Sequence, residues 1–278
     1  MSAAALLLIA EQEYEEQLRE DLRVISTGIP TLDDILGIGG IPRGHVTEVT
    51  GGFAAGKSVL TWHMGKACQE AGGQVVLLDV DRALAIKYMN SVGLNTNDAI
   101  ILRPCKIHDV TRVIAGAIGL GADMIIVDSI AAVPEASALP LKHMMDLYGA
   151  VHGSSTAVVV TNQYRTFDNK LQPMYKEMFE HIAPLSIDIA MNESLFDDGE
   201  IVGHNATICV RRNAFSALGH VCCLLQYGHG IDVMDCEIDM MLKRGEVVQR
   251  PGGWFDHGPA TYHGRKTLKE ALMRGINQ

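Results

Sequence analysis

Residues 51–58, "GGFAAGKS", restrict the possible folds of this chain more than any other segment. Gly51, Gly56, Lys57 and Ser58 fit the pattern G-x-x-x-x-G-K-[ST], whose backbone N–H groups wrap a di- or triphosphate. A β-branched run, "HVTEVT", precedes the pattern and a segment with helical spacing follows it, so the helix would direct its positive end at the phosphates. A glycine-rich turn before an amphipathic helix would also explain the glycines. The strand and the helix around them favour a nucleotide site.

Each part of this phosphate loop has an expected role. Lys57 would contact the β- and γ-phosphates of ATP, and the Ser58 hydroxyl would hold Mg²⁺. The glycines allow backbone angles that other residues avoid, and they let the main chain approach the anion closely. The nucleotide-binding residues expected in this segment are Gly51, Gly52, Phe53, Ala54, Ala55, Gly56, Lys57, Ser58 and Val59.

Composition limits the class of protein. The chain has 278 residues, of which 47% are hydrophobic and 20% charged, as expected for a globular protein with one large domain and small appendages. No stretch approaches the roughly 18 consecutive apolar residues of a membrane span. The six cysteines lack C-x-x-C spacing, which favours reduced thiols in a cytoplasmic protein over a zinc site. A net charge of −10 argues against nucleic-acid binding by the whole surface, although it says little about a local basic groove.

The apolar pattern predicts an α/β fold. Strand-like, nearly continuous apolar runs alternate with helical segments. The strand-like runs cover residues 74–81, 99–104, 123–130 and 156–163. Such strands are typical of a mostly parallel central sheet with helices on both faces. After residue 185 the strands follow one another closely with Gly and Asp turns. We expect them to extend the sheet in antiparallel fashion at its C-terminal side.

Carboxylates end two of these strands. Asp128 follows four apolar residues in "MIIVDS", where a buried strand can deliver a carboxylate to Mg²⁺ beside the phosphate loop. Taken alone, an aspartate at this place is often only a helix N-cap; the phosphate loop upstream favours the metal role. Asp79 and Asp81 raise the same question, because residues two apart on a strand point the same way. Either could face the nucleotide.

From Ile25 to Trp254 the order and spacing of the motifs resemble those of the RecA family of recombinases, including its phage UvsX branch. The matching segments are "ISTGIPTLDDILGIGGIPRG", "GGFAAGKS", "LLDVDRALAIKYMNSVG", "MIIVDSIAAV", "VVVTNQYR" and "LQYGHGID". The resemblance implies a RecA-type P-loop ATPase core that uses ATP and Mg²⁺. It also implies filaments on single-stranded DNA, pairing and strand exchange with homologous duplex DNA, and DNA-stimulated ATP hydrolysis in the cytoplasm, the host's if the chain is phage-encoded.

The resemblance also assigns roles to single residues. Asp81 matches the glutamate that activates the attacking water, but it is one methylene shorter, so slower hydrolysis is expected. Tyr88 matches the tyrosine that stacks on adenine, although Ala85 replaces an aspartate that contacts the base. Gln163 matches the residue that senses the γ-phosphate. Arg211 and Arg212 fall near the basic pair that reaches the γ-phosphate of a neighbouring protomer.

The family's two DNA loops would lie at residues 134–144 and 164–179. The second has cations interleaved with aromatic residues, which suits phosphate contact and base stacking. The paired glycines typical of this loop are missing and glutamates dilute its charge, so a merely solvated loop is the alternative. The expected DNA-binding residues are Lys142, Arg165, Phe167, Lys170 and Lys176.

Three parts of the chain are expected: an oligomerisation arm at residues 1–24 with an apolar helical stripe, the ATPase core at 25–254, and a short tail at 255–278. The expected assembly is a helical filament without membrane attachment. Two other classes share some of these features. One is a RecA-like ring or switch ATPase, and the other is a non-catalytic recombinase paralogue that modulates recombination.

Overall fold

A computed structural model gives the structure of the chain and describes residues 22–104, 106–132, 141–167 and 170–276. Most of the predicted arm at 1–24 and of the first predicted DNA loop at 134–144 therefore lies outside the described residues. Within the described part of the chain, no helix is long and apolar enough to span a membrane.

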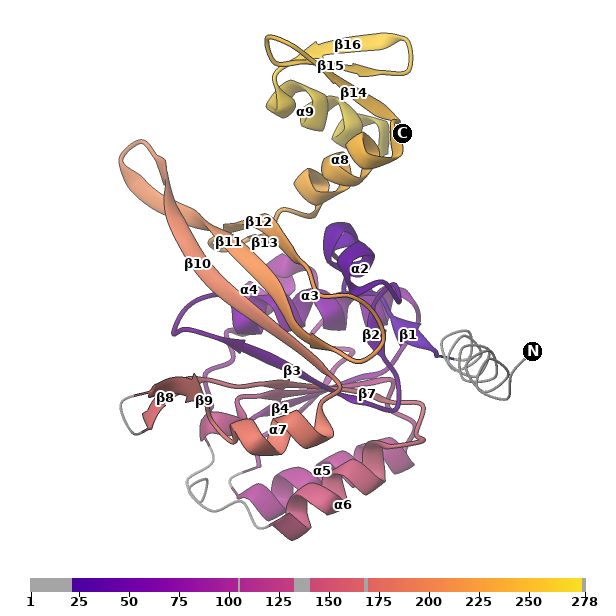
Figure 1. Cartoon of the computed structure of the whole chain (residues 1–278), viewed down its shortest axis with the longest axis vertical. Coiled ribbons are helices and arrows are strands. Elements are labelled where there is room, and N and C mark those ends of the chain that lie inside the picture. The colour runs from indigo at the N-terminus through magenta and orange to yellow at the C-terminus, as the bar shows by residue number, and fades with distance from the viewer. Residues whose placement is uncertain (1–21, 105, 133–140, 168–169, 277–278) are drawn as a thin grey trace, which may run out of the picture.

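A nine-stranded sheet forms the centre of the molecule, in the order β13-β12-β11-β10-β3-β7-β6-β4-β5 (Figure 1). Parallel pairing joins β3 (Val46–Gly51), β4 (Val75–Asp79), β5 (Ile100–Leu102), β6 (Met124–Asp128), β7 (Ala157–Thr161) and β10 (Leu185–Asp197). Antiparallel pairing adds β11 (Glu200–Asn213), β12 (His220–Gln226) and β13 (Gly230–Ile231). The predicted α/β fold, with its antiparallel extension, is confirmed.

Helices cover both faces of this sheet, as the apolar runs predict (Figure 1). Alternate residues of β4 enter the two cores, with Val75 and Leu77 on one side and Val76 and Leu78 on the other. The first core is covered by α2 (Pro30–Leu36), α3 (Lys57–Glu70) and α4 (Ile86–Val92). The second is covered by α5 (Ile107–Gly119), α6 (Leu141–Val151) and α7 (Lys176–Ile182).

Two small antiparallel pairs lie outside the central sheet. Near the start of the described chain, β1 (Val24–Ile25) pairs with β2 (Ile41–Pro42). The second pair joins β8 (Tyr164–Phe167) and β9 (Lys170–Pro173), so much of the segment predicted as the second DNA loop is a β-hairpin followed by α7. Tyr164 lies opposite Pro173 at the base of this hairpin.

The end of the chain folds as a small unit rather than as the expected tail (Figure 1, yellow). It contains α8 (Val233–Arg244), the three-stranded sheet of β14 (Val247–Arg250), β15 (Trp254–His257) and β16 (Ala260–His263), and α9 (Arg265–Ile276). Apolar residues from all these elements except β16 form its buried cluster, including Ile238, Phe255 and Leu268. The predicted boundary after residue 254 falls inside β15, because the cluster uses apolar residues from both sides of it.

Candidate nucleotide site and its neighbouring contacts

The phosphate loop connects the end of β3 to the start of α3. Gly56, with φ at 102°, precedes the helix, and a Cβ atom at this position would lie 2.5 Å from Cδ1 of Leu225. The angle favours glycine, because other residues rarely adopt it, and a larger residue would also displace the end of the Leu225 side chain. Leu225 lies on β12, so a side chain from the antiparallel part of the sheet packs against the loop. This cradle fits a polyphosphate at the helix N-terminus.

Lys57 is the first residue of α3 and is buried against the loop. Its Nζ donates to the main-chain oxygens of Gly51 at 3.1 Å and Gly52 at 2.7 Å. Burial lowers the pKa of Lys57, while the carboxylates of Asp128, Asp188 and Asp81 act in the opposite direction. The ammonium is thus held at the loop by two neutral carbonyl oxygens, which phosphate oxygens can replace.

A pocket of about 240 Å³ opens beside the loop. It brings together residues that the sequence analysis placed in four separate segments. The lining residues are Phe53, Ala54, Ala55, Gly56, Lys57, Ser58, Val59, Asp81, Asp128, Ser129 and Gln163. Among these, Lys57 carries the positive charge and Asp81 and Asp128 carry negative charges, a combination suited to a phosphate with a metal ion.

Asp128 and Ser58 are the residues that fit Mg²⁺. Asp128 is 6% exposed at the end of β6, and its Oδ1 accepts a hydrogen bond of 2.6 Å from Thr161 Oγ1 on the neighbouring strand β7. Thr161 fixes the carboxylate and leaves Oδ2 for another partner. Ser58 lies in the first turn of α3 on the same pocket. Carboxylate and hydroxyl oxygens are hard ligands of the kind that Mg²⁺ prefers.

Asp79 and Asp81 have different surroundings, contrary to the expectation that they point the same way. Strand β4 ends at Asp79, and Asp81 lies in the bend that follows. Asp79 is fully buried, accepting from Arg103 Nε at 2.9 Å and from the Ala83 main-chain nitrogen at 3.0 Å. Asp81 lines the pocket. Burial and then the negative charge of Asp128 raise its pKa, which makes it a better proton acceptor.

Gln163 follows β7 at the rim of the pocket and adjoins a buried polar network. Asn162 donates from Nδ2 to Glu48 Oε1 at 2.8 Å and to the main-chain oxygen of Met174 at 2.6 Å. Ser186 donates to the other oxygen of Glu48, whose pKa is raised by burial. Because Met174 also donates its main-chain N–H to the Gln163 oxygen, the network closes the base of the β8–β9 hairpin next to the pocket.

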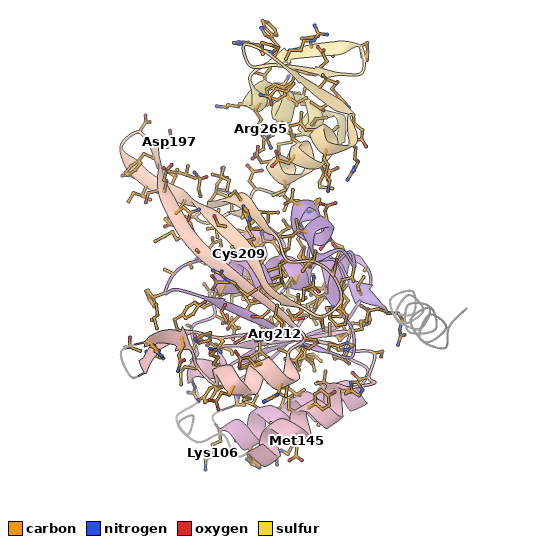
Figure 2. All side chains as sticks on the ribbon, in the orientation of Figure 1. Lys106, Met145, Asp197, Cys209, Arg212 and Arg265 are labelled. Carbon is orange, nitrogen blue, oxygen red and sulfur yellow. The ribbon has the colours of Figure 1, made fainter. Side chains whose placement is uncertain are left out.

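The two arginines of β11 have different partners. Arg211 reaches Asp188 Oδ2 with Nη2 at 3.2 Å, and its side chain is 61% exposed. Arg212 donates from Nη1 to the main-chain oxygens of Phe179 and Ala183, at 2.9 and 2.8 Å, and so satisfies carbonyls at the end of α7. Figure 2 shows Arg212 beside this helix. Arg211 is therefore the one whose guanidinium is available to a neighbouring molecule.

Comparison with known proteins gives the same family as the motifs. The RecA N-terminal domain family matches residues 9–140. The RecA protein of Gluconobacter oxydans is 30% identical over 275 residues, which cover 91% of this chain and 79% of the relative. The RecA protein of Chlorobium limicola is 30% identical over 274 residues, covering 89% of the chain and 77% of the relative. The chain belongs to the RecA family. The resemblance to the RecA family inferred from the sequence is thus confirmed.

Some residues carried over from the RecA family lie away from the pocket. Tyr88 on α4 is not among the described residues that line it; the ring packs edge-on against Trp62 and the hydroxyl donates to the Gln226 main-chain oxygen at 3.3 Å. Tyr88 is half-buried, so one part of its ring remains open.

The expected DNA-binding residues of this RecA-family chain fall on several elements. Arg165 on β8 and Lys170 on β9 are exposed, and Arg165 Nη2 lies 3.5 Å from Gln163 Oε1. Lys176 pairs with Glu180 at 3.8 Å along α7. Phe167 and Lys142 belong to β8 and α6, but their side chains lie outside the described ones.

Sequence reasoning missed three residues of this region. Thr161 and Ser129 gave no signal, because a hydroxyl residue at a strand end is common. Asp188 gave one: it is a charged residue in "LSIDIAMNE", where its neighbours predict a buried strand. In such a strand a carboxylate is expected to have partners.

Proposed function

We propose that this RecA-family chain is an ATP-dependent DNA recombinase that forms filaments on single-stranded DNA, pairs it with homologous duplex DNA and exchanges strands. The observation that supports this most is the pocket, where the phosphate loop meets Asp81, Asp128 and Gln163 next to the base of an exposed hairpin with basic residues. Such a site can couple ATP hydrolysis to a DNA contact. The cytoplasm is the compartment where we expect it to act.

The proposed hydrolysis uses residues of the pocket in separate roles. The loop and Lys57 bind the phosphates, and Ser58 and Asp128 hold Mg²⁺, which neutralises phosphate charge when bound. Asp81 accepts the proton of the attacking water, and its raised pKa suits this task. Gln163 adjoins the γ-phosphate position and begins the hairpin segment, so it can report the nucleotide state to the DNA contact.

A second protomer completes the proposed site. Among the described residues that line the pocket, Lys57 is the one cation, so a further cation would add to the stabilisation of the transferred phosphoryl group. Arg211 lies outside the pocket and is largely exposed, so it can serve the site of a neighbour in a filament. A cation supplied in trans in this way stabilises the transition state as an arginine finger does.

An ATPase assay with and without single-stranded DNA, paired with electron micrographs, tests this function. We expect hydrolysis stimulated by DNA and open helical filaments in the presence of ATP. Closed rings would instead indicate a ring motor. Nucleotide binding without hydrolysis under any condition would indicate a non-catalytic paralogue.

Removal of residues 1–22 should leave a folded monomer that binds ATP but has lost both filaments and DNA-stimulated hydrolysis. The pocket residues all lie after residue 50, whereas the apolar stripe of the arm would pack on the adjacent protomer, and a head-to-tail contact propagates as an open helix. Sedimentation with ATP and single-stranded DNA, alongside phosphate release, measures both properties.

Point variants of the arm provide a matched pair for this truncation. The apolar stripe expected from the sequence consists of Leu7, Leu8, Tyr14, Leu18 and Leu22. Leu18→Glu places a charge in this stripe and should act like the truncation, while Gln17→Glu places the same residue beside the stripe and should not. Assembly that survives truncation would mean that the arm is not the interface. Hydrolysis that survives the loss of assembly would mean that the active site is complete within one chain.

A further inference from the structure

Asp188 on β10 is a nearly buried carboxylate that contacts three functional parts of the chain. It is 5% exposed, and its Oδ1 accepts from Thr50 Oγ1 and from the Tyr164 hydroxyl, both at 2.8 Å. Its Oδ2 lies 3.2 Å from Arg211 Nη2. The strand register explains the arrangement, because Asp188 pairs with Thr50 across β3 and with Cys209, two residues before Arg211, across β11.

The three partners of Asp188 come from different functional segments. Thr50 directly precedes Gly51 of the phosphate loop. Tyr164 is the first residue of the β8–β9 hairpin, which is the proposed DNA contact. Arg211 is the cation proposed to act on a neighbour's ATP. The charge of Asp188 also reaches Lys57, whose ammonium it stabilises. A single side chain therefore contacts or influences each part that a DNA-stimulated ATPase must connect.

Of the three contacts that Asp188 makes, the one to Arg211 is the easiest to break. Its distance of 3.2 Å exceeds the 2.8 Å of the two hydroxyl contacts, and the guanidinium is 61% exposed to solvent. An ion pair with an exposed partner changes an equilibrium by about fivefold, equivalent to about 1 kcal/mol. A neighbour's ATP, which carries several negative charges, can overcome an attraction of this size.

We propose that Asp188 is a positioning residue that holds Arg211 within its own protomer and releases it when DNA moves Tyr164. Tyr164 and Arg211 contact different oxygens of one carboxylate. A shift of the hairpin that carries the Tyr164 hydroxyl with it turns the carboxylate and lengthens the weaker contact to Arg211. The guanidinium is then free for the neighbouring site. This role rests on the proposed function, because it requires both a DNA contact and hydrolysis completed in trans.

Substitutions of Asp188 and of Tyr164 should change ATP hydrolysis in opposite ways. Asp188→Asn keeps an acceptor oxygen for Thr50 and Tyr164 but removes the charge that holds Arg211, so DNA-free hydrolysis should rise about fivefold. The rise should grow with protein concentration, because Arg211 acts on another protomer. Tyr164→Phe leaves Arg211 held but disconnects the hairpin, so hydrolysis with DNA should fall toward the DNA-free rate while DNA affinity, measured by fluorescence anisotropy, is retained.

Asp123→Asn is the matched control, because it breaks an ion pair of 2.8 Å with Arg43 remote from the hairpin and should leave the stimulation by DNA unchanged. A purely structural role for Asp188 would lower both rates of Asp188→Asn together with its melting temperature, and would overturn the proposal. If Asp188→Asn does not fold, Tyr164→Phe decides: unchanged stimulation by DNA overturns the proposal. Absence of DNA stimulation in the wild type would overturn the proposed function itself, and this role with it.

Discussion

Lys57→Ala is expected to abolish measurable ATP hydrolysis and to weaken ATP binding strongly. The substitution removes the cation from the pocket lining, and charge-assisted phosphate contacts are about twice as strong as neutral ones. Loss of one such group in a catalytic site lowers turnover by at least about 100-fold. Phosphate release and the binding of a fluorescent ATP analogue measure the two effects. Turnover near that of the wild type would contradict the assignment of the site.

The effect of Lys57→Ala should not come from unfolding. Among the described residues, the ammonium donates to the carbonyls of Gly51 and Gly52, and its burial carries a desolvation cost that lowers its pKa. We therefore expect a melting temperature close to that of the wild type. Lys66→Ala is the matched control: Lys66 lies on the same helix, pairs with Glu70 at 3.7 Å and is absent from the pocket lining, so both activities should be kept.

The parts of this structure that local sequence patterns determine could be predicted. Buried strands such as β6 and β7 consist of apolar residues alone up to their polar ends, so their position and parallel pairing follow from the pattern. The phosphate loop could be predicted because its motif has a fixed spacing, and two of its glycines, Gly51 and Gly56, have the positive φ angles that favour glycine. The position of Asp128 could be predicted as well, since it ends an apolar strand of the same parallel sheet and so lies at the same edge as the loop.

Other features depend on contacts between distant residues and could not be predicted. Arg212 binds the carbonyls of Phe179 and Ala183, about thirty residues earlier, and no pattern around Arg212 distinguishes it from Arg211. The fold of the C-terminal unit depends on apolar residues that are far apart in the sequence, since Ile238 of α8, Phe255 of β15 and Leu268 of α9 meet in one buried cluster. The hairpin gave no clear signal either, because the sequence between its strands, Asp168 and Asn169, lacks the glycine that two-residue hairpin turns favour.

Asp81→Asn is expected to reduce turnover by about 100-fold or more while leaving ATP affinity nearly intact. This is the usual scale for losing a positioned general base. The raised pKa of Asp81 adds a test by pH. A base must be deprotonated to act, so hydrolysis should decline on the acid side at a higher pH than the ordinary value of 3.8 would give. In Asp81→Glu, which restores the family's residue, we expect faster hydrolysis than in the wild type if reach limits the reaction.

Asp79→Asn separates the two carboxylates. Asp79 is fully buried between Arg103 and the Ala83 main chain, so its neutralisation removes a structural ion pair. In Asp79→Asn an NH₂ group replaces one of the two accepting oxygens at a fully buried position, so we expect a lower melting temperature together with similar losses in ATP binding and turnover. Asp81→Asn should instead lower turnover alone, because Asp81 accepts from the neutral main-chain N–H of Ala83 and faces the pocket. If Asp79→Asn lowers turnover at unchanged stability and Asp81→Asn does not, Asp79 is the base.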